Sequence, residues 1–116
     1  MQPRLPIPTY LLKDARFKAA YTKALGPLAR EPWISGLEGP APALRQVTVA
    51  GSEYTLAATC KPHDCADHNL VALWQPQQGR VLGLVQQRGK KTMFGAPDAA
   101  QAREIEKLWA AEWRRR

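Results

Sequence analysis

Apolar and polar residues alternate with a period of two through the middle of the chain, which is typical of half-buried β-strands. From residue 44 to 60 the alternation is interrupted once, by the small residues at 50–52, so this segment predicts a hairpin. Three further strands are expected after short polar turns, at 70–74, 80–87 and 91–94. Because tight turns join them, the strands predict an antiparallel sheet. The alternating apolar positions of the hairpin are Val47, Val49, Tyr54, Leu56 and Ala58.

Helical periodicity is found near the two ends of the chain. Thr9 is expected to cap a helix over 10–25, which Gly26–Pro27 ends. Asp98 begins a second helix, and Gln101 three residues on completes a capping-box pattern. The sequence therefore predicts an α+β fold, with a central antiparallel sheet of about five strands flanked by N- and C-terminal helices. The apolar residues spaced to place the second helix on the sheet are Ala102, Ile105, Leu108, Trp109 and Trp113.

The length of the chain predicts one domain. With 116 residues it can bury one core but not two, so residues 1–116 are expected to fold as a single unit. The proline-rich residues 1–8 are expected to form an extended arm. Residues 31–42 are crowded with Pro and Gly, which predicts a loop whose Trp33 closes the edge of the core.

The charge balance favours acidic partners. Lys and Arg number 17 against 10 Asp and Glu, a formal net charge of +7. The basic residues are spread along the chain, with a run only at 114–116, and aromatic and basic residues do not interleave as in an RNA-binding strand. Nucleic acid is therefore not an expected partner.

Two features bear on the cellular compartment. The chain has no run of 18 apolar residues, and its first residues lack the apolar region of a signal peptide. We therefore expect no membrane partner, and either a cytosolic protein or one whose leader has been removed. The two cysteines lie close together, which favours an oxidising compartment and hence the second option.

The segment 60–65, CKPHDC, carries the most specific chemistry in the sequence. Two cysteines five positions apart can clamp a short loop, and Pro62 fixes a backbone angle within it. A disulfide around so small a ring would remove only about 2 kcal/mol of unfolded-chain freedom, so its role would be local rigidity. His63 lies near the tip, and a protonated imidazole donates hydrogen bonds from both ring nitrogens, which suits a pair of carboxylates.

The same region admits a metal-binding alternative. Cys60, His63, Cys65 and His68 form a C-x2-H-x-C-x2-H pattern of zinc-competent side chains. Structural zinc sites usually take their ligands as two pairs separated by a longer segment, whereas this run is tight and contains a proline. A simpler interpretation makes His68 a polar turn residue after the loop.

Catalytic motifs are lacking in the sequence. Ser35 and Ser52 lie in turn-like segments and neither is in a G-x-S-x-G motif. No glycine-rich phosphate loop or dinucleotide fingerprint is present either. We therefore expect a protein that is not an enzyme and that needs no cofactor.

The run CKPHDC closely resembles the inhibitor of vertebrate lysozyme family (Ivy). In this chain it is entered from a strand that begins G-x-x-Y, with Gly51 and Tyr54, and it is followed by a polar turn and an apolar strand. Looser matches extend from the first helix through Trp33 and Gly36 to residues 95–97 before the last helix. The resemblance implies a periplasmic protein of Gram-negative bacteria that blocks lysozyme by pushing this loop into the substrate cleft.

The resemblance also implies roles for single residues. Cys60 and Cys65 would form the loop disulfide, and His63 would engage the catalytic acid and the nucleophile of the enzyme. The residues expected to shape the loop and touch the walls of the cleft are Lys61, Pro62 and Asp64.

Several partners remain open. A net charge of +7 would slow association with the basic lysozymes of animals, so the bacterium's own lytic transglycosylases are an alternative target. A homodimer is a further option if Trp33 or Trp74 lies in exposed apolar surface. A periplasmic scaffold domain without inhibitory activity is a third hypothesis.

Overall fold

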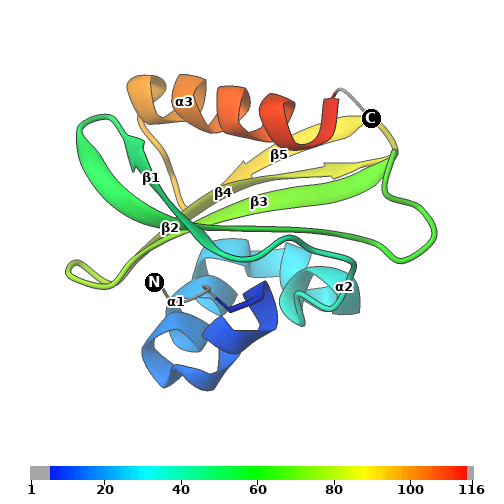
Figure 1. Cartoon of the computed structure of the whole chain (residues 1–116), viewed down its shortest axis with the longest axis horizontal. Coiled ribbons are helices and arrows are strands. Elements are labelled where there is room, and N and C mark those ends of the chain that lie inside the picture. The colour runs from blue at the N-terminus through cyan, green and yellow to red at the C-terminus, as the bar shows by residue number, and fades with distance from the viewer. Residues whose placement is uncertain (1–5, 115–116) are drawn as a thin grey trace, which may run out of the picture.

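The computed structural model describes residues 6–114 and confirms the predicted α+β architecture (Figure 1). Five strands form one antiparallel sheet in which the spatial order β1-β2-β3-β4-β5 equals the order along the chain. Each strand therefore pairs with its neighbours in sequence, as short connections dictate. The strands are β1 (Arg45–Val49), β2 (Ser52–Cys60), β3 (His68–Gln75), β4 (Arg80–Gln87) and β5 (Lys90–Phe94).

Two of the connections are two-residue turns with left-handed backbone. Ala50 and Gly51 join β1 to β2 with φ angles of 49° and 83°, and Arg88 and Gly89 join β4 to β5 with φ angles of 52° and 79°. Positive φ at both central residues is the mark of a type I′ turn, whose twist matches that of the strands. The positions of these residues are thus set by the register of the sheet.

One face of the sheet is covered by the N-terminal helices (Figure 1). Phe17 packs edge-on against Trp74 with ring centroids 5.4 Å apart. The hydroxyl of Tyr21 donates a 2.6 Å hydrogen bond to the carbonyl of Ile34, and burial raises the pKa of this hydroxyl well above its usual value. The elements of this layer are the 3₁₀ turns η1 (Pro8–Lys13) and η2 (Gly26–Arg30) and the helices α1 (Ala15–Leu25) and α2 (Pro32–Ser35).

The start of the first helix differs from the prediction over 10–25. The α-helix begins at Ala15, and Asp14 rather than Thr9 caps it, accepting hydrogen bonds from the backbone N–H of Arg16 and Phe17. Asp14 has extended backbone, with φ −90° and ψ 114°, so it separates the 3₁₀ turn from the helix. A short acidic side chain two to three residues before free N–H groups is the stronger cap.

Only the end of the arm predicted over residues 1–8 falls within the described residues. Residues 1–5 lie outside the described residues, and Pro8 already begins η1. The backbone N–H of Leu44 donates to the carbonyl of Pro6, which places this short stretch beside the segment that leads into β1.

The opposite face of the sheet is covered by α3 (Ala99–Trp109), which continues as a π-helical turn over Ala110–Arg114 (Figure 1). The predicted capping box is present, since Asp98 Oδ1 accepts from the N–H of Gln101 at 2.8 Å and Gln101 Oε1 accepts from the N–H of Asp98 at 3.0 Å. The side chains of α3 and the turn that pack on the sheet are Ile105, Trp109 and Trp113.

Both faces of the sheet are therefore covered, and this excludes the surface that we considered for a homodimer. Trp33 and Trp74 are only 5% and 3% exposed, because both lie in the core between the N-terminal layer and the sheet. Trp33 is part of the core, although it lies in α2 rather than in the loop that we expected. Among residues 6–114, no helix has the length and apolar character required to cross a membrane.

Candidate functional site

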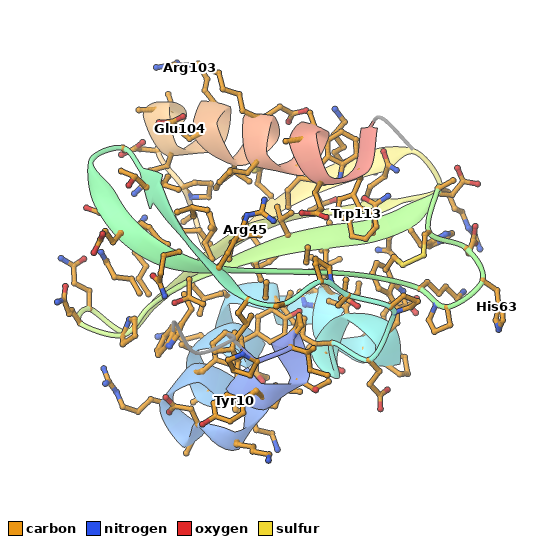
Figure 2. All side chains as sticks on the ribbon, in the orientation of Figure 1. Tyr10, Arg45, His63, Arg103, Glu104 and Trp113 are labelled. Atoms are coloured by element: carbon orange, nitrogen blue, oxygen red, sulfur yellow. A yellow bond between two sulfur atoms is a disulfide. The ribbon has the colours of Figure 1, made fainter. Side chains whose placement is uncertain are left out.

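The β2–β3 loop projects from one end of the sheet, and His63 lies at its outermost point (Figure 2). Lys61, Pro62 and His63 are exposed, whereas Asp64 and Cys65 are half-buried. The loop thus presents a cation, a proline ring and an imidazole to solvent. This places the three residues where a partner can reach them.

A disulfide between Cys60 and Cys65 closes the loop, with the two Cα atoms 4.9 Å apart. Cys60 is the last residue of β2 and is 1% exposed, so one end of the clasp is fixed in the core. Sulfurs bonded to each other cannot serve as thiolate ligands, which overturns the four-ligand metal alternative. Over the part of the chain that the structure describes, no group of three or more His, Cys, Asp or Glu side chains is arranged to hold a metal ion.

The tip of the loop is a β-turn. The backbone N–H of Asp64 donates to the carbonyl of Lys61 at 2.9 Å, which puts Pro62 and His63 at the two central positions. His63 has a φ of 68°, and proline followed by a residue of positive φ is the signature of a type II turn. Glycine is favoured at that second position, and an L-residue there is strained by about 1 kcal/mol. The turn therefore exposes the imidazole of His63 in a backbone conformation that is unfavourable for this residue.

Buried polar side chains of the sheet hold the base of the loop. Asn69, 1% exposed, donates from Nδ2 to the carbonyl of Cys65 at 2.8 Å and accepts from Trp109 Nε1 at 2.6 Å. Gln86 donates from Nε2 to the carbonyl of Ala66 at 3.1 Å. Neither amide is predicted as an anchor from the motifs in the sequence. Their signal is a pair of amides, Asn69 and Gln86, within otherwise apolar strands, where a buried polar group needs a partner.

The segment before β1 packs against the same base. A Cβ atom at Gly39 would lie 1.5 Å from the carbonyl oxygen of Cys60 and 2.9 Å from Thr59 Oγ1. Only glycine allows the backbone to approach so closely. The loop is therefore supported from the strand side by Asn69 and Gln86 and from the other side by residue 39.

His68 is not the turn residue that we expected. It is the first residue of β3, and its side chain is 12% exposed. Its Nδ1 lies 2.9 Å from Oδ2 of Asp64, close enough for an ion pair but poorly aligned for a hydrogen bond. The ring also meets Trp33 edge-on, with centroids 6.2 Å apart. Asp64 is thus partly turned toward its own fold rather than wholly toward a partner.

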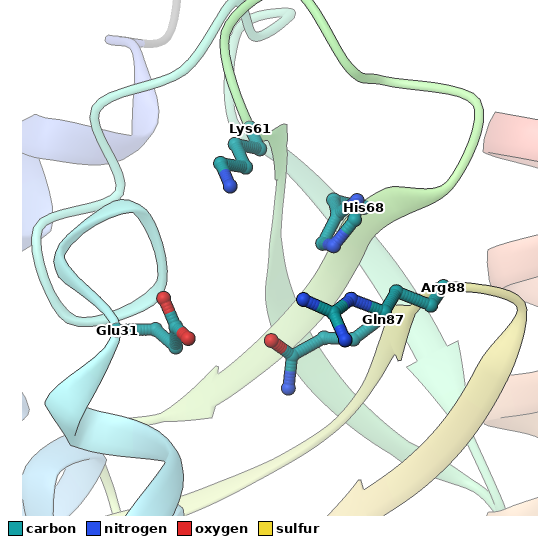
Figure 3. A pocket seen from close by; sticks show the side chains of 5 residues that line it. All are labelled: Glu31, Lys61, His68, Gln87 and Arg88. Carbon is teal, nitrogen blue, oxygen red and sulfur yellow. The ribbon is translucent and has the colours of Figure 1, made fainter.

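A polar notch of about 360 Å³ lies beside the loop (Figure 3). Its lining comes from the loop, from the start of β3, from the β4–β5 turn and from the junction before α2. The lining residues are Glu31, Lys61, His68, Gln87 and Arg88.

Comparison with known proteins connects this site to a family. The family model described as "Inhibitor of vertebrate lysozyme (Ivy)" matches residues 16–116. An inhibitor of vertebrate lysozyme from Pseudomonas aeruginosa is 33% identical over 52 residues, which cover 45% of this chain and 34% of that protein. The protein of the same name from Escherichia coli K12 is 27% identical over 84 residues, which cover 71% of this chain and 52% of that protein. The matches thus span about half of these relatives or less.

Proposed function

The chain belongs to the inhibitor of vertebrate lysozyme (Ivy) family, and on this premise we propose that it is a proteinaceous inhibitor of lysozyme-type glycosidases that cleave peptidoglycan. The proposed mechanism is insertion of the loop 60–65 into the catalytic cleft of the enzyme. The single observation that carries this mechanism is His63, exposed at the tip of a loop that is covalently closed and anchored to the core.

The chemistry of the target suits an imidazole at this tip. Retaining glycosidases hold their two catalytic carboxyl groups about 5 Å apart. A protonated imidazole has a donor on each ring nitrogen and can span such a pair. Occupation of the cleft by His63 would then block the acid, the nucleophile and the substrate site together.

Rigidity of the loop supports the same mechanism. Ordering a loop on binding costs free energy, and a loop ordered beforehand avoids that cost. Here the disulfide, the turn at Pro62 and the amide of Asn69 fix the backbone on both sides of His63. In this proposal Lys61 and Pro62 contact the walls of the cleft, and Asp64 does so with its exposed part, its side chain being 43% exposed. The chain itself acts as an inhibitor and performs no reaction.

A second candidate target is a lytic transglycosylase of the same bacterium. The net charge of +7 favours this candidate over a strongly basic animal lysozyme, because like charges slow association. A stable disulfide requires an oxidising compartment, and the periplasm, where both the cell wall and its cleaving enzymes are found, is the location that we propose.

The test is an inhibition assay against a panel of lysozymes and soluble lytic transglycosylases. The variant is His63→Asn, because Asn tolerates left-handed backbone and so preserves the turn. We expect the inhibition constant to rise by about thirtyfold or more, as for a central interface residue. Gln78→Asn, at an exposed turn beyond the opposite end of β3, is the matched control and should inhibit like wild type. Equal inhibition by the His63 variant would remove this residue from the mechanism.

A further inference from the structure

The polar notch lies beside the base of the loop that, in the proposed function, enters the cleft of the target. Lys61 is the first residue after β2, and His68 is the first residue of β3, so two lining residues belong to the base of the inserted loop. Arg88 projects from the β4–β5 turn and Glu31 from the junction before α2 (Figure 3). If the tip enters a cleft, the rim of that cleft meets this notch.

The charges of the notch are available to a partner. Within residues 6–114, neither Lys61 nor Arg88 makes an ion pair or a side-chain hydrogen bond. The carboxylate of Asp64 is already close to His68, at 2.9 Å from its Nδ1. Glu31 is the one carboxylate in the described lining. Two unpaired cations thus face one carboxylate, and the imidazole of His68 adds no negative charge.

The position of Arg88 is set by the backbone rather than by side-chain contacts. It occupies the first central position of a type I′ turn, next to the ladder pair of Gln87 and Lys90. Asn and Gly are the usual residues at that position. The turn therefore fixes the Cα atom of Arg88 beside the loop, and all five N–H donors of its exposed guanidinium remain free for a planar acceptor.

We propose that this notch receives a carboxylate side chain from the rim of the target's cleft, bound between Lys61 and Arg88. This inference rests on the proposed function and specifies its partner: a peptidoglycan-cleaving enzyme with an acidic residue on the wall of its cleft. The contact is separate from the engagement of His63 with the catalytic carboxyls. Glu31 on the far wall limits the notch to one such group, because like charges repel.

The test measures inhibition constants for Arg88→Asn against the panel enzyme that wild type inhibits most strongly. Asn suits the type I′ turn, so the fold is preserved while the cation is removed. Loss of a charge-assisted contact should weaken inhibition about tenfold at low salt, and by less when the ionic strength is raised about tenfold. Arg103→Asn, an exposed residue of α3 with the same change in net charge, should stay within about twofold of wild type (Figure 2).

The sign of the charge in the partner is tested by Glu31→Gln. Removing the opposing carboxylate should tighten inhibition severalfold if the partner group is a carboxylate. Tighter inhibition by Arg88→Asn together with weaker inhibition by Glu31→Gln would show a cationic partner group and would overturn the inference. An Arg88→Asn constant equal to that of Arg103→Asn would also overturn it.

The two proposals fail in different ways. Inhibition that depends on His63 but not on Arg88 leaves the proposed function in place and overturns the notch contact alone. Absence of inhibition by wild type, or inhibition that is indifferent to His63, overturns the proposed mechanism and the notch contact with it.

Discussion

The indole Nε1–H of Trp109 donates a 2.6 Å hydrogen bond to Oδ1 of Asn69, and this contact ties the last helix to the loop. Asn69 in turn contacts the loop, since its Nδ2 donates a hydrogen bond to the carbonyl of Cys65. The indole lies on α3, the amide on β3 and the carbonyl in the loop, so three elements share one polar chain. Placement of His63 therefore depends on the helix that covers the far side of the sheet.

We predict that Asn69→Leu lowers both stability and inhibition. The substitution leaves the buried indole of Trp109 and the part-buried carbonyl of Cys65 without their partners, at about 2–3 kcal/mol of unfolding free energy. The loop should also lose its position, so that the inhibition constant of the folded variant rises. Urea denaturation and an inhibition assay check the two effects. Thr48→Leu, at an exposed position of β1, is the control, and equal behaviour of the two variants would contradict the prediction.

We predict that removing the disulfide affects the loop more than the fold. By the loop-entropy relation, Cys60→Ala/Cys65→Ala should lose about 2 kcal/mol of stability, which leaves the domain folded. Inhibition should weaken about tenfold, because the loop must then be ordered on binding. Circular dichroism verifies the fold and kinetics gives the inhibition constant. Reduced wild-type protein should behave in the same way, and undiminished inhibition by either form would show that the clasp is dispensable.

We predict that Gly39→Ala displaces the base of the loop, because residue 39 packs against Cys60. A methyl group there would lie 1.5 Å from the carbonyl oxygen of Cys60, and the main chain must move to admit it, at about 2 kcal/mol or more. Gly51→Ala offers a contrast, since its Cβ meets nothing within 4 Å and only its φ of 83° is unfavourable. Thermal unfolding should rank the Gly39 variant as the less stable, and only this variant should inhibit poorly. The reverse ranking would mean that the approach of residue 39 to β2 is not tight in solution.

We predict that the protein loses stability at alkaline pH because Tyr21 is buried with its proton. Burial raises the pKa of its hydroxyl, so the folded state keeps the proton when the unfolded state releases it above about pH 10. This contribution is complete below the unfolded pKa and is lost as the pH rises beyond it. Tyr21→Phe should be less stable by about 1–2 kcal/mol at neutral pH, since the carbonyl of Ile34 loses its donor, but it should lose less on going to alkali.

The measurement for Tyr21 is the difference in unfolding free energy between variant and wild type as a function of pH. Lysines and the other tyrosines titrate in both proteins, so their effects cancel in the difference. Tyr10→Phe, at a side chain 54% exposed, is the control for the loss of a hydroxyl outside the core. A flat difference for Tyr21→Phe would contradict the prediction.

The general architecture could be read from the sequence because its signals are local. Alternation over 44–60, turns at glycine and a capping box at Asp98 each depend on neighbouring residues, and the structure shows all of them. The predicted start of the first helix is wrong by five residues because Thr9 and Asp14 both have side chains typical of N-caps. Which one serves depends on where η1 packs, and that is a tertiary effect.

The site could be predicted only at its tip. The spacing of CKPHDC indicates a loop with a histidine near its end, and the structure shows it there. The supports of the loop come from residues distant in sequence: Trp109 lies 40 positions from Asn69. Arg88 and Glu31 meet Lys61 only because the sheet and the N-terminal layer bring them to one edge. The periodicity of the sequence therefore cannot predict that these three side chains line one notch.

The sheet follows the chain strand by strand, with no crossover between its first and last members. Every strand thus pairs with a strand that is only a short connection away in the sequence. Contacts of short sequence separation form quickly during folding. The two cysteines are brought together when the second hairpin closes, without waiting for the rest of the polypeptide. The disulfide loop can therefore close early, within a segment of little more than twenty residues between Ser52 and Gln75, and the last helix fixes its position later, when Trp109 binds Asn69.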